Sequence, residues 1–136
     1  MRVLETQWWR LGLPDEWNAE QDDESILITD RDEVGTIEIS HLIAEPGEAQ
    51  PSIEELAKLN AEHDNLEWSS CCCGDFDGVE TVYLEDGAAI RELWLRAQSL
   101  TLFVTYVCDE ENRRLDDAIV DEILDGLELV VESLNE

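Results

Sequence analysis

The side chains in this sequence best suited to chemistry are a few thiols and imidazoles. Four cysteines occur, three of them consecutive in Cys71–Cys73 and the fourth at Cys108. Three thiolates with His41 or His63 would match in number the four ligands that zinc takes in structural sites. The paired C-x₂-C spacing typical of such sites is absent, however. Since cysteine is also a common buried residue, we expect buried free thiols and no bound metal.

A disulfide or redox role for these cysteines depends on where the fold places them. Adjacent cysteines are poor disulfide partners, because closing that ring distorts the peptide between them. On a strand, Cys71 and Cys73 would share one face while Cys72 points to the other. Cys108 could join the first pair if its strand lies nearby, which would favour a metal site, a redox pair or a disulfide.

No arrangement typical of catalysis is visible in the sequence. A cysteine, a histidine and an acid are all present, but His41 falls in an apolar strand pattern and His63 on an amphipathic helix among acids. The segment Asp75–Gly78 is similar to the start of a calcium loop, yet Asp86 stands where that loop needs glutamate. A glycine-rich phosphate loop and a serine nucleophile elbow are absent from the sequence. We therefore expect no enzymatic activity, no catalytic residue and no cofactor.

Acidic side chains dominate the composition. There are 35 acidic and 8 basic residues, giving a formal net charge of −27, and Lys58 is the only lysine. This charge argues against nucleic acid and anionic membranes as partners. Three explanations fit: an acidic surface that serves solubility, adaptation to a salty cytoplasm, or a basic partner protein. The acids are spread along the whole chain, which favours the first two explanations.

The length of 136 residues predicts a single domain over residues 1–136 with a core of its own. A hydrophobic fraction of 43% with five tryptophans excludes wholesale disorder. No stretch approaches the roughly 18 consecutive apolar residues of a membrane helix. The first ten residues also lack the apolar segment of a signal peptide, so we expect a cytoplasmic protein.

A β-hairpin from Ala88 to Cys108 should organise the fold. Two runs of apolar and β-branched residues flank Gln98-Ser99, which predicts the turn at that pair. In this register one face of the hairpin is aliphatic and suits a core. Its residues are Leu93, Leu95, Leu102 and Val104.

The opposite face of the hairpin carries the candidate partner-binding residues. There Trp94 lies across from Phe103, and Arg96 lies two residues farther along the strand. If both helices cover the aliphatic face, this aromatic pair stays on the open side of the sheet. Tryptophan and arginine are enriched at binding hot spots, so Trp94, Phe103 and Arg96 are the candidate contact residues. The alternative is that the pair packs against a connecting loop or against Trp8-Trp9.

The remaining sequence predicts further strands and two helices. Alternating or β-branched runs indicate strands at residues 8–11, 25–29, 36–42, 67–73 and 79–84, with turns at 13–17, 30–35, 74–78 and 85–87. A capping box that opens at Ser52 predicts a helix over residues 53–63. Helical spacing continues from Leu115 to Leu134, although Asp125-Gly126 could end this helix and leave residues 127–131 extended.

The summed order is β-β-β-α-β-β-β-β-α. It predicts an α+β fold in which two helices pack against an antiparallel sheet of about six to seven strands. This order, the Leu13-Pro14-x-x-Trp17 turn, the turn at Gly74 and Gly78, and the long hairpin before a helix resemble the PsbP-like superfamily. That superfamily includes PsbP proteins of photosystem II, Mog-type Ran-binding import factors and bacterial DcrB-like proteins.

The resemblance spans nearly the whole chain and rests on structural residues. It implies a bacterial or archaeal member of the superfamily. The sequence departs from some members in that we expect no lipoprotein or transit segment. Because members mostly bind other proteins, the resemblance implies a protein-interaction domain by analogy. No residue here can be matched to a Ran-binding or photosystem contact, so none is carried over.

Two functions lead on these grounds, ahead of a third class, a small-ligand or metal-dependent enzyme. The leading one is a non-enzymatic protein-interaction domain with a strongly acidic surface. The alternative is an acidic inhibitor or immunity-type protein that neutralises a basic toxin or nuclease. The partner in both is another protein, and neither function predicts an oligomeric state.

We predict that thermal stability rises with salt concentration. The compact state holds a formal charge of −27, so its carboxylates repel one another. The screening length is about 8 Å at physiological ionic strength and shortens as salt is added. The melting temperature, measured from low salt to molar potassium chloride, should therefore increase. A flat or falling melting temperature would show that the acids are balanced locally.

Overall fold

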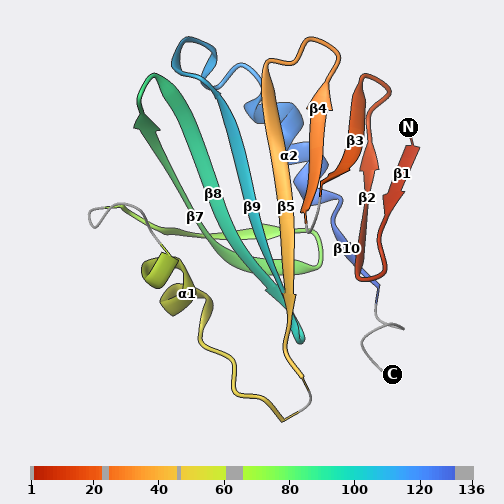
Figure 1. The fold of residues 1–136 in the computed structure, drawn as a ribbon, viewed down its shortest axis with the longest axis vertical. Coiled ribbons are helices and arrows are strands. Elements are labelled where there is room, and N and C mark those ends of the chain that lie inside the picture. The colour runs from red at the N-terminus through yellow and green to blue at the C-terminus, as the bar shows by residue number, and fades with distance from the viewer. Residues whose placement is uncertain (1, 23–24, 46, 61–65, 131–136) are drawn as a thin grey trace.

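The computed structural model describes residues 2–22, 25–45, 47–60 and 66–130. The larger of its two antiparallel sheets has seven strands in the order β3-β4-β5-β9-β8-β7-β6 (Figure 1). The bounds of these strands are β3 Trp17–Asp22, β4 Ser25–Asp30, β5 Gly35–Ile43, β6 Ser69–Cys73, β7 Phe76–Glu85, β8 Ala88–Ala97 and β9 Leu100–Asp109.

A smaller sheet of three strands lies against the larger one, in the order β1-β2-β10. Its strands are β1 Arg2–Glu5, β2 Trp9–Leu13 and β10 Glu128–Leu129. The helices are α1 Ile53–Asn60 and α2 Asp117–Asp125, and a short 3₁₀-helix at Glu110–Asn112 precedes α2. Neither helix has the length and apolar character needed to cross a membrane, within the described part of the chain. The predicted α+β class is confirmed.

The β8–β9 hairpin has the predicted register. Ala97 pairs with Leu100 across the Gln98-Ser99 turn, and the pairing continues to Ala88 opposite Asp109. The four aliphatic residues expected on one face, Leu93, Leu95, Leu102 and Val104, are each 0% exposed. Alternation along the two strands thus produces a dry core face.

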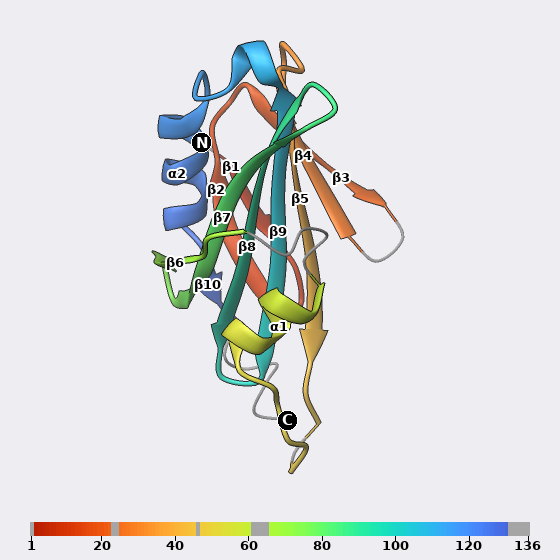
Figure 2. The same ribbon diagram turned by 90° about the vertical axis from the view of Figure 1, so that its left-hand side faces the viewer.

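The two helices lie on opposite faces of the large sheet (Figure 2). On the aliphatic face, α2 and strand β2 supply the main core, through residues such as Trp9 and Leu124. On the other face, Ile53 and Ala57 of α1 pack with Val79 and Trp94. The helices therefore do not both cover the aliphatic face, which was the condition under which the aromatic pair would stay on an open side of the sheet. The sequence reveals the apolar side of each helix but not which face of the sheet receives it.

The helix boundaries follow their local signals. The Glu55 amide donates to the Ser52 hydroxyl oxygen at 3.1 Å, as the capping box predicts. Residues 61–63 of the predicted helix lie outside the described residues. At the other end of the chain, α2 ends before Gly126, and the next residues are extended in β10. This confirms the alternative in which the last helix ends at Asp125-Gly126 and an extended segment follows it.

Two strands and one turn differ from the sequence prediction. Strands β1 and β3 were not expected, because both are edge strands whose residues are mostly exposed. The strand predicted at residues 8–11 is β2, which belongs to the small sheet. The turn predicted over Gly74–Gly78 is only two residues long, since β7 already begins at Phe76.

The shortened turn joins the two sheets. Gly74 has a φ of +60°, and a Cβ there would lie 1.9 Å from the Leu127 carbonyl oxygen. The Asp75 amide donates to that same oxygen at 3.0 Å, and the Leu129 amide donates to Asp75 Oδ2 at 3.0 Å. The segment after α2 is therefore bound directly to the β6–β7 turn of the large sheet. The Asp75 carboxylate has a structural partner here.

We predict that Gly74→Ala destabilises the fold by about 2–5 kcal/mol. The left-handed conformation costs a side chain about 1–2 kcal/mol, and the clash with Leu127 adds overpacking strain. Gly87→Ala is the matched control, because Gly87 has a φ of +84° but a Cβ added there would meet no atom within 4 Å. Urea unfolding of both variants measures the difference. Equal losses would show that the contact at Leu127 is unimportant.

Candidate functional site

The predicted aromatic pair forms and lies beside α1. The ring centroids of Trp94 and Phe103 are 4.5 Å apart with an interplanar angle of 30°. Trp94 is 6% exposed, since α1 covers it through Ile53 and Ala57. Phe103 is half-buried and packs against the same cluster from its edge. The pair therefore contacts α1, whereas Trp9 belongs to the core on the other face.

A groove of about 400 Å³ begins where α1 stops covering this pair. Its walls come from β9, β8 and β5 and from the adjoining ends of β3 and β4. Ser40 of β5 pairs with Phe103 on one side and with Ser25 on the other, which brings these walls together. The residues that line it include Asp22, Ser25, Glu38, Ser40, Leu42, Trp94, Thr101 and Phe103. The groove thus has an aromatic end beside α1 and a polar, acidic end toward β4.

The acidic end gives the groove its charge preference. Asp22 and Glu38 both line it, and the Ser25 hydroxyl donates to Glu38 Oε2 at 3.2 Å. A cation held by such carboxylates next to an aromatic face gains cation–π attraction in addition to the ionic one. The arrangement suits an arginine or lysine side chain of another protein. Sequence analysis missed both acids, because in sequence they lie far from the hairpin that they flank.

Arg96 does not present a free guanidinium to the groove. Its Nε and Nη2 atoms donate to the Thr101 hydroxyl at 3.1 and 3.0 Å, and Nη1 donates to the Pro51 carbonyl at 2.6 Å. Pro51 lies just before α1, so Arg96 ties the start of that helix to the hairpin. The structure brings Arg96 and the aromatic pair together, with Arg96 in a positioning role. A direct contact between Arg96 and a partner stays a prediction.

The cysteines are not assembled into one site. Cys71 and Cys73 share a face of β6 as predicted, whereas Cys108 lies on β9 with β7 and β8 between them. The Cys72 thiol donates to Asp77 Oδ1 at 3.0 Å, and all four cysteines are free. Cys108 therefore cannot join the first pair. No cluster of three metal-binding side chains occurs among the residues that the structure describes.

The thiols and His41 lie in surroundings that are typical of structural side chains. A hydrogen bond with Cys71 raises the pKa of Cys73, and burial raises the pKa of Cys108, so both favour the neutral thiol. The hydrogen bond from Cys73 lowers the pKa of Cys71. The His41 ring lies 6.3 Å from the Trp8 ring between centroids. His63 lies outside the described residues.

Comparison with known proteins shows the fold. The sequence matches no family model and no curated protein. A crystal structure from Bacteroides thetaiotaomicron VPI-5482 superposes with a TM-score of 0.65 at 18% identity, over 90% of this chain and 45% of that one. Cyanobacterial PsbP from Synechocystis sp. PCC 6803 gives a TM-score of 0.53 at 7% identity, over 94% and 91% of the two chains.

A third structure agrees with these two. LpqN, a protein involved in cell envelope biogenesis of Mycobacterium tuberculosis, gives a TM-score of 0.55 at 15% identity, over 89% of this chain and 82% of that one. The chain therefore has the PsbP-like fold that its sequence resembles, and it spans less than half of the Bacteroides structure. Likeness at such low identity concerns architecture alone.

We predict that alanine substitutions separate the roles of the two aromatic residues. Trp94→Ala empties a buried site and should lower the free energy of unfolding by about 3–5 kcal/mol. Phe103→Ala removes a half-buried ring and should cost about 1–2 kcal/mol, which leaves the domain folded. Chemical denaturation of both variants gives the values. Severe unfolding of Phe103→Ala would place that ring in the core and remove it from the groove wall.

Proposed function

We propose that this chain is a non-enzymatic protein-interaction domain that binds a basic segment of another protein in the groove beside α1. The observation that carries the proposal is the placement of Asp22 and Glu38 next to the Trp94–Phe103 pair. Aromatic anchors with charged groups around them are the composition that concentrates binding energy at interfaces. The fold is consistent with this role but does not by itself assign it.

The charge of the whole chain supports a basic partner. A formal charge of −27 attracts cationic segments over long distances and accelerates their encounter at low salt. The same charge repels phosphates, so nucleic acid and anionic membranes are not the proposed partners. We place the interaction in the cytoplasm, where free thiols such as the exposed Cys72 stay reduced. Membership of the Ran-binding or DcrB-like branches is a further proposal that rests on sequence resemblance.

A second candidate function is an acidic inhibitor or immunity-type protein that neutralises a basic toxin or nuclease. The observation that favours it is the acidic excess of the whole chain, with 35 acidic against 8 basic residues. Such an inhibitor would use many surface carboxylates at once. Removing one acid from the groove would then affect binding no more than removing an acid elsewhere.

The test uses a fluorescein-labelled hexapeptide that contains a leucine flanked by two arginines. This peptide is titrated with the full chain at low salt. Glu38→Gln keeps the size of the side chain and removes its charge, so it should weaken binding several-fold, as should Phe103→Ala. Glu122→Gln is the matched control, because this exposed acid lies on α2 across the sheet. Fluorescence anisotropy reports the dissociation constants.

The outcomes separate the two functions. Weaker peptide binding by the Glu38→Gln and Phe103→Ala variants, with unchanged binding by Glu122→Gln, supports the groove as the binding site. Equal, small effects of the two charge variants favour the distributed inhibitor surface and contradict the groove. If the peptide binds the unmodified chain and all three variants with the same dissociation constant, this result contradicts the proposed site as well.

A further inference from the structure

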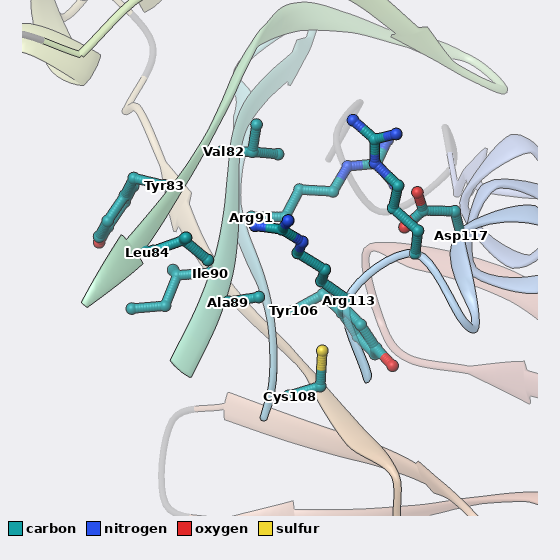
Figure 3. A pocket seen from close by; sticks show the side chains of 11 residues that line it. Val82, Tyr83, Leu84, Ala89, Ile90, Arg91, Tyr106, Cys108, Arg113 and Asp117 are labelled. Atoms are coloured by element: carbon teal, nitrogen blue, oxygen red, sulfur yellow. The ribbon is translucent and has the colours of Figure 1, made fainter. Parts of the chain in front are cut away.

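A second cavity, of about 630 Å³, is lined by residues of the large sheet (Figure 3). It lies on the opposite face of this sheet from the groove, because its residues Arg91 and Tyr106 share the face of Leu93. One wall is formed by β7, β8 and β9, and the other by the segment that leads into α2 and by the first residue of that helix, Asp117. Val82, Leu84, Ala89 and Cys108 supply apolar surface, and arginines supply the opposite wall. In Figure 3 the side chain of Arg113 extends from its loop toward β8.

Basic residues are concentrated in this cavity. Three of the chain's eight basic residues line it, although acids outnumber bases more than fourfold overall. Arg91 is neutralised, because it pairs with Glu80 at 2.8 Å and Asp121 at 2.7 Å. Arg113 and Arg114 form no ion pair with any residue in the described ranges. These two guanidiniums are therefore available to an anion.

The acids around the cavity leave these two arginines unsatisfied. Asp117 is the acid among the lining residues. The neighbouring Asp116 accepts a hydrogen bond from the Tyr106 hydroxyl at 2.9 Å. Two unpaired guanidiniums thus stand against one lining carboxylate, on a protein whose surface is otherwise strongly acidic.

The backbone holds the arginines at a conformational cost. Arg114 has a φ of +70°, in the left-handed region that bulky residues rarely adopt. The turn is closed by the Arg113 amide, which donates to the Glu110 carbonyl at 3.2 Å, and by the Leu115 amide, which donates to the Asn112 carbonyl at 3.0 Å. Strain of this kind concentrates at binding sites, where the surrounding structure maintains it.

The apolar wall beside the arginines is uncovered. Val82 is 71% exposed and Leu84 is 46% exposed, although both lie on the face that forms the core farther down the sheet. Asp117 of α2 lines the cavity as well, but α2 leaves Val82 and Leu84 exposed. An apolar strip and an adjacent cationic group match the two parts of an amphipathic anion.

We infer that this cavity binds a carboxylate that carries a short apolar chain. Arg113 and Arg114 hold the carboxylate through the paired N–H donors of their guanidiniums. The hydrocarbon chain lies along Val82 and Leu84 toward Ala89. The cavity volume falls in the range of about 300–1,000 Å³ usual for small-molecule sites. This site is separate from the groove and does not depend on the proposed partner function.

The test is isothermal titration of the full chain with octanoate, below its micelle concentration, in low-salt buffer. Acetate lacks the apolar chain, octanol lacks the charge, and inorganic phosphate tests for simple anion binding. Octanoate should bind at least about tenfold more tightly than any of these three, because only octanoate satisfies both walls.

Substitutions show where binding occurs. The double variant Arg113→Gln with Arg114→Gln should lose octanoate binding, and Val82→Asn should weaken it several-fold. Lys58→Gln, an exposed cation on α1 across the sheet, removes one charge and should leave binding unchanged. Melting temperatures confirm that each variant is folded.

Three results would overturn the inference: equal binding of octanol and octanoate, phosphate binding as tight as octanoate binding, or retention of octanoate binding by the double arginine variant. The first would show a purely apolar site and the second a general anion site. The third would place octanoate elsewhere on the chain.

Discussion

The structure depends on the register of the β8–β9 hairpin. With Trp94 opposite Phe103, the aliphatic side chains of both strands fall on one face and the aromatic pair on the other. A shift of one residue would reverse both sets and place leucines against α1. Each buried leucine contributes about 1.5–3 kcal/mol relative to an exposed one, so the four aliphatic residues strongly select this pairing. The hairpin thereby decides what each helix and the small sheet must cover.

The helices and the small sheet cover the two faces of the large sheet unequally. Each candidate site lies at the edge of a covered region. On the core face, α2 and the small sheet leave Val82 and Leu84 exposed beside Arg113. On the other face, α1 has only eight residues and covers Trp94 but not the region over β5. The hydrogen bonds at Asp75 limit where α2 can lie, because they bind the residues after this helix to the β6–β7 turn.

The sequence predicts the elements whose signals are local. The hairpin register follows from alternation on two long strands and the start of α1 from Ser52, whereas the end of α2 at Gly126 was one of two open alternatives. Strand β3 carries no such signal, because it is exposed along most of its length and pairs only at the sheet edge. The turn at Gly74 was predicted too long, since Gly78 is needed for close approach to the Trp94 carbonyl and not for a turn.

The candidate sites depend on contacts that a single sequence does not reveal. Glu38 reaches the aromatic pair because β5 pairs with β9, two strands more than fifty residues apart in sequence. Arg113 and Arg114 are adjacent polar residues in a loop, and only the fold places them over an apolar wall. The sequence likewise does not determine which helix covers Trp94, because an amphipathic helix suits either face of a sheet.

The central claim is that the hairpin is enclosed by different elements on its two faces, with α1 on the aromatic one. It is tested most directly by nuclear Overhauser contacts in a sample with labelled methyl and indole groups. We predict contacts from the Ala57 methyl to the Trp94 indole, and from the Leu124 methyls to the core around Trp9. Contacts between the Trp94 indole and Trp9 or Leu124, without contacts to Ala57, would contradict the account.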